Sequence, residues 1–150
     1  EGTEYDYDGN LIFDGEFLNG KIWNGRRIQY DYLGNFIFEC EYKNGKRDGK
    51  GEIYDNNGHI IFVGEFKNDK RNGKGEEYDY LGNIIYEGEF LNGEKHGNGK
   101  EYKNGELIYD VEYFKGKKTG NVKCEKDNNF KGEYLFNRKW KEKNMIKTEI

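Results

Sequence analysis

The chain has 150 residues, of which only 33% are hydrophobic, and its formal net charge is −4 with acids and bases interspersed. The low aliphatic content excludes a thick core, and the mixed charge excludes a broadly basic nucleic-acid binder. Twenty-two glycines and an aromatic fraction of 17% favour strands and tight turns over helices or disorder.

The first twelve residues match the second half of a longer unit. Tyr5 and Gly9 have the same spacing as Tyr78 and Gly82. We therefore expect residues 1–12 to form a partial repeat. We also expect Glu1 to be either a cut through a longer array or the start of a processed product.

An aromatic phrase then recurs along nearly the whole chain. It reads FDGEF, FECEY, FVGEF, YEGEF, YDVEY and FKGEY, and the copies begin at Phe13, Phe38, Phe62, Tyr86, Tyr109 and Phe130. The intervals are 25, 24, 24, 23 and 21 residues. Repetition at this period is typical of a stacked array of small units. We therefore assign tandem repeats to residues 13–129.

Each copy contains two turn signals, which leaves two strands of about five residues and so predicts a β-hairpin. In the fourth copy Asn92-Gly93 is the expected tight turn. Pairing outward from it places Phe90 opposite Lys95, Gly88 opposite Gly97 and Tyr86 opposite Gly99. The glycines would then leave room for the rings to lie across the neighbouring strand. The same arithmetic predicts ring and cation pairs at Phe66–Arg71, Tyr42–Arg47 and Tyr113–Lys118.

The two ends of the array depart from this pattern. In the first copy Gly20 and Gly25 are one residue further apart than Gly45 and Gly49, which predicts a bulge or widened turn near Trp23. Residues 130–150 lose their glycines after FKGEY and are expected to form a half repeat and a C-terminal cap. The fold class is therefore all-β, an elongated single-layer antiparallel meander of about twelve strands in about six tandem hairpins.

The motif, Y-x-G-x-F/Y followed by an N-G turn and K-R-x-G-x-G, resembles the MORN repeat and its bacterial-type variant. The resemblance covers residues 4–134. The copies at Phe62 and Tyr86 match well, whereas the copy at Tyr109 has Val111 and Val122 in glycine positions. The resemblance implies a non-enzymatic array that serves protein interaction and scaffolding, and a phosphoinositide role has been proposed for the family.

The aromatic face is the first candidate site. One interpretation is that its rings are only the thin core of the sheet. The other is that a single layer leaves an aromatic groove partly exposed, so that it receives a helix or an extended peptide of a protein partner. The candidate residues are Phe38, Tyr42, Phe62, Phe66, Tyr86, Phe90, Tyr109 and Tyr113, together with Phe13 and Phe17.

Charge at the turns is the second candidate. Turns within hairpins are basic and turns between hairpins carry Asp6, Asp8, Asp31, Asp55 and Asp79, so a meander would have one basic and one acidic border. These residues are either solvated turns, or the basic border binds anionic lipid or an acidic partner. The residues assigned to this anionic-partner edge are Lys46, Arg47, Lys70, Arg71, Lys95, Lys117 and Lys118.

Catalytic and metal sites are not expected. The chain has no Ser, and its two histidines, His59 and His96, are both expected to lie in turns. A glutamate recurs in every copy. Successive copies are about 10 Å apart, which is too far for the paired carboxylates of a glycosidase, so a structural role is favoured. These glutamates are Glu16, Glu41, Glu65, Glu89, Glu112 and Glu133. Cys40 and Cys124 are expected to be small packing residues, and Trp23 and Trp140 either cap residues or interface anchors.

No cofactor and no nucleic-acid partner are expected. The absence of an apolar run of about 20 residues and of a signal peptide indicates an intracellular, cytoplasmic protein, with a position beside a membrane or the cytoskeleton left open. A third class of function is structural, in which the ends of the array pair to form a homodimer or an end-to-end assembly.

Overall fold

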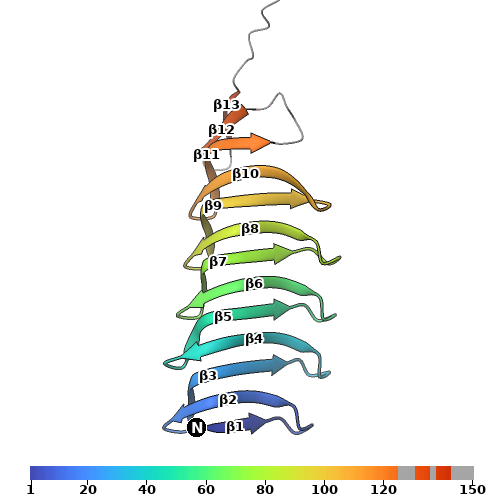
Figure 1. Ribbon diagram of the computed structural model, residues 1–150, viewed down its shortest axis with the longest axis vertical. Helices are drawn as coiled ribbons and strands as arrows, with labels where there is room; N and C mark the ends of the chain where they lie inside the picture. Colours follow the sequence, from blue (N-terminus) through green and yellow to red (C-terminus); the bar gives the residue numbers. More distant parts are fainter. Residues whose placement is uncertain (125–130, 136–137, 143–150) are drawn as a thin grey trace, which may run out of the picture.

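The computed structural model describes residues 1–124, 131–135 and 138–142, with side chains for residues 1–119. Within these residues the chain forms one antiparallel sheet of 13 strands, arranged in chain order along the long axis (Figure 1). The strands are β1 (Gly2–Tyr5), β2 (Leu11–Leu18), β3 (Lys21–Tyr30), β4 (Phe36–Lys43), β5 (Lys46–Tyr54), β6 (Ile60–Lys67), β7 (Lys70–Tyr78), β8 (Ile84–Leu91), β9 (Glu94–Lys103), β10 (Glu106–Phe114), β11 (Lys117–Cys124), β12 (Lys131–Leu135) and β13 (Arg138–Glu142). The expected single-layer meander of tandem hairpins is confirmed.

Tight two-residue turns connect the two strands of each hairpin from β2–β3 to β10–β11 on one edge of the sheet, the left edge in Figure 1. Asn44 and Gly45 have φ of 52° and 74°, and Asn92 and Gly93 have φ of 53° and 92°. Positive φ at both central residues matches the right-handed twist of the flanking strands, which is why Asn-Gly recurs there. The longer turns between hairpins, at residues 6–10, 31–35, 55–59 and 79–83, lie on the opposite edge, and Asn104 and Gly105 form a two-residue turn between β9 and β10 on that edge.

Successive hairpins are also joined by backbone hydrogen bonds from turn to strand. The N–H of Gly93 donates to the carbonyl of Arg71 at 2.8 Å, and the N–H of Gly116 donates to Lys95 at 2.8 Å. Gly45 donates in the same way to Trp23 at 2.8 Å. Each turn therefore takes its position from the hairpin before it, which fixes the stacking of the array.

The strand register corrects part of the sequence prediction. Phe90 does pair with Lys95, but Gly88 pairs with Gly99 rather than Gly97, and Tyr86 pairs with Glu101. The cause is a bulge, in which His96, Gly97 and Asn98 all oppose the single residue Glu89. The predicted pairing assumed a continuous register, so beyond the bulge each predicted partner is two residues away from the observed one.

The same bulge recurs in β4–β5 and β6–β7, where it accommodates the recurrent glutamate, whereas in β10–β11 the extra residues oppose Val111. Glu65 accepts a hydrogen bond from the N–H of Lys74 at 3.2 Å, and Glu41 accepts one from Lys50 at 3.1 Å. A Cβ on Gly73, whose φ is +108°, would lie 1.9 Å from the Glu65 carboxylate oxygen. The first glycine of Gly-x-Gly is thus required by a carboxylate and the structural interpretation of these glutamates is confirmed for these two.

The second glycine is required by a ring. Phe62 is fully buried and lies over the paired Gly64 and Gly75, where added Cβ atoms would be 2.6 Å and 2.7 Å from its Cζ. Tyr86 covers Gly88 and Gly99 in the same way. The prediction that glycines make room for rings is confirmed. Each ring covers two glycines that pair with each other across neighbouring strands.

The first hairpin has the predicted bulge at Trp23. Phe17 pairs with Ile22 and Glu16 pairs with Asn24, so Trp23 is the one extra residue. The difference from the other hairpins is that their bulges contain two extra residues. His96 lies in β9, and its assignment to a turn was wrong; His59 is in a turn, as expected.

The C-terminal expectations fall largely outside the described residues. Strands β12 and β13 continue the meander within the region assigned to a half repeat and cap. Phe130 and the side chains of Cys124, Glu133 and Trp140 lie outside what the structure describes.

Candidate functional site

The aromatic side of the sheet, here called the ring face, is filled by rings that touch one another across the hairpins. Phe62 makes edge-to-face contacts with Phe66 of its own hairpin at 5.6 Å between centroids and with Phe90 of the next at 5.4 Å. Phe90 contacts Tyr86 at 5.5 Å, and Tyr86 contacts Tyr113 at 5.6 Å. Each such pair contributes about 0.5–1.5 kcal/mol beyond its burial. The ring row is therefore a continuous core one side chain thick.

Cations cover this row from outside, but not over the predicted rings. Arg71 was expected over the directly opposed Phe66. Its guanidinium lies instead 4.0 Å from the Phe62 centroid and 5.9 Å from that of Phe90. Lys95 lies 3.8 Å from Tyr86 and 5.7 Å from Tyr113. Arg47, Arg71 and Lys95 thus each bridge the first ring of their own copy and the second ring of the next copy.

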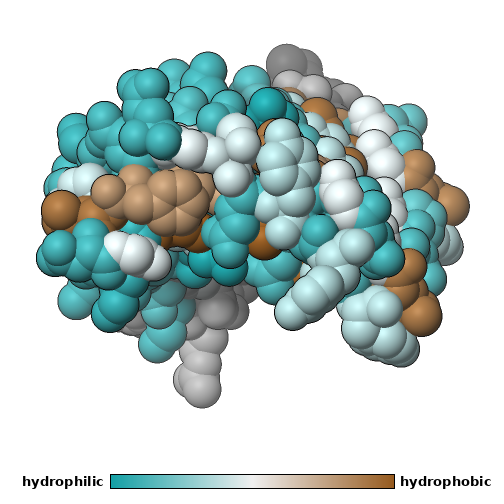
Figure 2. All heavy atoms as spheres, turned by 90° about the horizontal axis from the view of Figure 1, so that it is seen from below, coloured by the Kyte–Doolittle hydropathy of each residue, from teal (hydrophilic) through white to brown (hydrophobic). Residues whose placement is uncertain are grey.

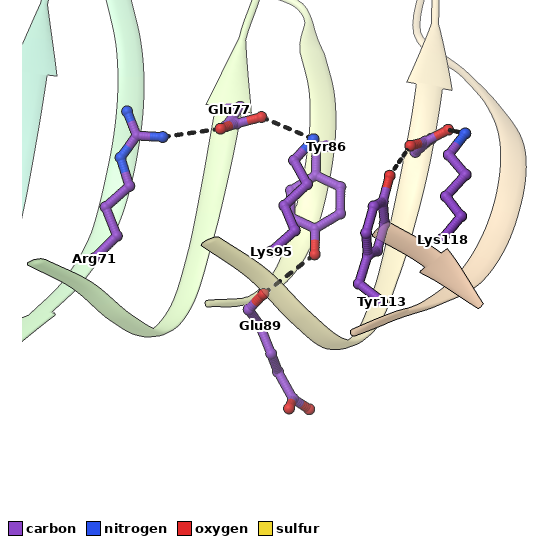
Figure 3. Close-up of polar contacts among 8 residues, drawn as sticks. Arg71, Glu77, Tyr86, Glu89, Lys95, Tyr113 and Lys118 are labelled. Carbon is purple, nitrogen blue, oxygen red and sulfur yellow. Dashed lines mark hydrogen bonds and ion pairs between the residues drawn. The ribbon is translucent and has the colours of Figure 1, made fainter. Parts of the chain in front are cut away.

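Carboxylates link these cations into a chain along the sheet. Glu77 receives Arg71 at 2.9 Å and Lys95 at 3.0 Å, so one carboxylate joins two successive hairpins (Figure 3). Lys118 pairs with Glu101 at 2.6 Å, and the Tyr113 hydroxyl donates to the same carboxylate. The Glu77 side chain is 21% exposed and those of Arg71 and Lys95 are 27% and 26% exposed. The charges of these cations are thus balanced by carboxylates on the ring face itself.

The ring face is consequently closed over most of the array. Six of the eight aromatic residues assigned to partner binding are buried, and Tyr42 and Tyr109 are half-buried. The buried six are Phe38, Phe62, Phe66, Tyr86, Phe90 and Tyr113. For these six the interpretation as the thin core of the sheet is confirmed, and they are not partly exposed, because the cations and the rings of neighbouring copies cover them. Binding of a partner on this face stays a prediction.

The residues assigned to the anionic-partner edge separate into two groups. Arg47, Arg71, Lys95 and Lys118 lie over rings on the ring face. Lys46, Lys70 and Lys117 are exposed at the ends of strands next to the tight turns. Only the second group lies on an outer border, where the sequence placed all seven.

Among the residues whose side chains are described, the ring face is open at the first hairpin. Ile22 stands opposite Phe17 where the next hairpins have Arg47, Arg71 and Lys95, and Phe17 is 40% exposed against 4% for Phe66. A hollow of about 760 Å³ is lined there by residues that include Trp23 and Tyr42. From this end of the array, hydrophobic side chains gather mainly at two sides with hydrophilic ones between them (Figure 2).

The opposite side of the sheet, here called the charged face, holds a trough of about 670 Å³ that crosses β5 to β10. Its floor is glycine backbone, and Val63 is the single apolar side chain among charged and polar ones. The trough is lined by Lys50, Gly51, Glu52, Val63, Gly64, Glu65, Lys74, Gly75, Glu76, Glu87, Gly88, Glu89, Asn98, Gly99, Lys100 and Asp110.

Like charges face each other across this trough. Glu76 pairs directly with Glu87 in the register of β7 and β8, an arrangement that is unfavourable unless neighbours compensate it. Lys100 lies 3.3 Å from Glu87, and the Tyr78 hydroxyl donates to Glu76. Burial and this hydrogen bond raise the pKa of Tyr78 to about 12, and the same causes raise the pKa of Tyr54 beside Glu52 to about 12.

Cys40 occupies a glycine position of the repeat and is 1% exposed. Burial raises the pKa of its thiol to about 12, which keeps it protonated and unreactive at neutral pH. Among residues whose side chains are described, no three His, Cys, Asp or Glu side chains come together as a metal site requires. The described part of the chain also has no helix that is long and apolar enough to span a membrane.

A family comparison agrees with this geometry. The MORN repeat model matches residues 39–60, 62–80 and 86–106. Residues 39–106 carry three consecutive MORN repeats. No curated protein matches it. The matched segments cover β5, β7 and β9 and most of the strands paired with them, where rings, glycines and cations follow one pattern.

MORN repeats are in general a non-catalytic type of repeat that mediates interaction with proteins or membranes. In this chain the MORN pattern specifies the closed ring face. The first hairpin, where Ile22 replaces the cation, lies outside the matched residues. Surfaces that the pattern leaves exposed are therefore further candidates for contact with a partner.

Proposed function

We propose that this chain is a non-enzymatic scaffold whose MORN repeats hold an extended segment of a partner protein in the trough of the charged face. The observation that carries the proposal is the trough itself, which continues over six strands of a sheet whose other face is closed. A rigid support of this kind lowers the entropy lost on binding.

The lining of the trough favours a polar, charge-complementary segment over an apolar one. Lys74 and Lys100 are exposed there and Glu76 and Glu87 are half-buried, so both signs are within reach of a bound chain. Contacts of this kind select a partner and its register more than they add affinity.

Selection of peptides from a displayed library against the full chain tests the proposal. Selected peptides should bind the wild-type chain and lose at least tenfold in affinity to a Val63→Arg, Glu76→Lys variant. The matched control is Lys46→Gln, which lies on the hairpin edge and should bind as the wild type does. Equal affinity for all three chains would show that the trough is not the contact surface.

A second candidate function is contact with an anionic lipid surface. The exposed Lys46, Lys70 and Lys117 on the tight-turn edge favour it, because cations near such a surface contribute about 1 kcal/mol each. Vesicles with and without phosphoinositide distinguish it from protein binding. Equal binding to neutral and anionic vesicles would end this candidate. The expected self-association remains a prediction that sedimentation at several concentrations can test.

A further inference from the structure

Four turns on the edge between hairpins share one hydrogen-bond pattern. In the turn of residues 31–35, Asp31 Oδ1 accepts from the N–H groups of Leu33 and Asn35 at 2.8 Å and 2.9 Å. Asp31 Oδ2 accepts from the Asn35 side-chain amide at 2.9 Å, and the Asp31 N–H donates to the Asn35 carbonyl at 2.8 Å. The same backbone and Oδ1 contacts recur at residues 6–10, 55–59 and 79–83, and the four are here called the aspartate turns.

Two aspartate turns present the same exposed pair at their tips. Tyr32 and Leu33 are 94% and 71% exposed, and Tyr80 and Leu81 are 73% and 69% exposed. The first aspartate turn adds Tyr7, which is fully exposed. Single exposed apolar residues are ordinary, but the same Tyr-Leu pair at the same position of a rigid turn is not.

The third aspartate turn shows that folding does not require these side chains. Asn56 and Asn57 occupy its tip, yet Asp55 accepts from the N–H groups of Asn57 and His59 at 2.8 Å and 2.9 Å as in the other turns. Because the turn forms equally with two polar tips, Tyr-Leu at the others has no structural cause within the described residues.

Exposed Tyr and Leu on a rigid turn have the properties of interface anchors. Tyr supplies a large contact area with little loss of side-chain freedom, and it is enriched among residues that dominate binding energy. The aspartate contacts hold the turn in one conformation before any partner arrives, which reduces the entropic cost of binding.

Charge on this edge indicates the class of partner. The four aspartate turns contain five aspartates and no Lys or Arg. Hydrogen bonds within the turns lower the pKa of Asp6, Asp31, Asp55 and Asp79, so these carboxylates stay ionised at neutral pH. Neighbouring aspartate turns are two strands apart, or about 10 Å at the usual strand spacing. The tips at residues 32–33 and 80–81 are then about 20 Å apart, within reach of one helical or extended segment.

We propose that the aspartate-turn edge docks a basic protein segment whose apolar side chains contact Tyr32 and Leu33 at one point and Tyr80 and Leu81 at another. The aspartates attract and orient the basic residues, and the Tyr-Leu tips supply the apolar contact. This surface is separate from the trough, so the inference goes beyond the function proposed above.

The test uses the full chain and three synthetic peptides of 18 residues. One is an amphipathic helix of Lys and Leu, the second has Glu in place of every Lys, and the third has Lys with Ser in place of Leu. Titration calorimetry at low and moderate salt measures each affinity. The Lys-Leu peptide should bind at least tenfold more tightly than either of the others, and more weakly as salt rises.

The third aspartate turn supplies the matched variants. Replacing both tips with its own residues, Tyr32→Asn, Leu33→Asn, Tyr80→Asn and Leu81→Asn, should weaken binding at least tenfold without changing the melting temperature. The reverse change, Asn56→Tyr with Asn57→Leu, should tighten binding severalfold. Val63→Arg in the trough should leave this affinity unchanged, which separates the outcome from that of the scaffold proposal.

Three results would overturn the inference. Equal binding of the Glu-Leu peptide would show nonspecific apolar association only. An unchanged affinity in the fourfold Asn variant would show that the tips make no contact. Concentration-dependent sedimentation of the wild-type chain that this variant abolishes would show that the tips bind a second copy of the chain instead of a basic segment.

Discussion

The ring face and the charged face belong to the same strands but are built by opposite rules. On the ring face, Phe62 is fully buried. The cation above it and the carboxylate that pairs with that cation both make their contacts within the sheet. On the charged face, Glu76 and Glu87 oppose each other across an open trough. A one-layer sheet therefore takes most of its stability from one face, and the other face and both edges remain exposed to solvent.

Adjacent residues on the two faces give the largest test of this comparison. Phe62→Ala should lower the free energy of unfolding by about 3–5 kcal/mol, because it removes a buried ring over a glycine pair. Val63→Ala should cost less than about 1 kcal/mol, since that side chain is only half-buried in the trough. Chemical denaturation measures both, and similar losses would contradict a one-sided core.

Glycine substitution tests how closely the rings of the ring face pack on the glycine backbone. Gly64→Ala should cost about 1–3 kcal/mol, because the new Cβ would meet the Phe62 ring at 2.6 Å and the Gly75 backbone at 2.7 Å. Gly2→Ala is the control, since its nearest neighbour would be at 3.6 Å, an ordinary contact. Thermal unfolding should separate the two variants, and an unchanged melting temperature for Gly64→Ala would rule out close packing there.

The carboxylates of β7 offer a smaller matched pair. Glu77→Gln should cost about 1–2 kcal/mol, because it leaves the partly buried Arg71 and Lys95 without their shared counter-charge. Glu76→Gln on the other face should change stability by no more than about 0.5 kcal/mol, since it also relieves repulsion from Glu87. Equal effects in denaturation would mean that the Glu77 bridge adds nothing.

The smallest effect is confined to alkaline pH. The pKa of Tyr54 and of Tyr78 is raised to about 12, against an ordinary value near 10. A phenol whose folded pKa is raised contributes stability that is present below the unfolded pKa and lost as the pH rises through the folded value. Stability should therefore fall between pH 10 and 12. The double variant Tyr54→Phe, Tyr78→Phe should make this fall shallower without abolishing it, because burial raises the pKa of Cys40, Tyr86 and Tyr113 as well. An unaltered profile would contradict the prediction.

Local pattern was sufficient for much of the fold. Asn-Gly at Asn92 and Gly93 predicts a tight turn from its own backbone preferences, and the pairs nearest that turn, such as Phe90 with Lys95, followed correctly. The prediction failed beyond Glu89, where the bulge depends on a carboxylate reaching across to a neighbouring strand. Residue spacing along one strand cannot predict a contact between two strands.

The candidate surfaces show the same division. The aspartate turns were recognised as an acidic border, but the exposed Tyr32 and Leu33 were not singled out because exposure cannot be read from residue type. The signal that could have found them is the contrast between Tyr-Leu and Asn56-Asn57 at one position of otherwise similar turns. The trough was not anticipated, since it forms only when six strands lie side by side.

By itself the sequence determined the repeat, the hairpins and which residues share a face, because a 24-residue period, Asn-Gly turns and two-residue alternation act within a few residues of each other. Only the tertiary structure decided that most of the rings are covered by neighbouring side chains. Arg71 reaches the rings of two copies and Glu77 joins two cations, and these contacts exist only between hairpins that are already stacked.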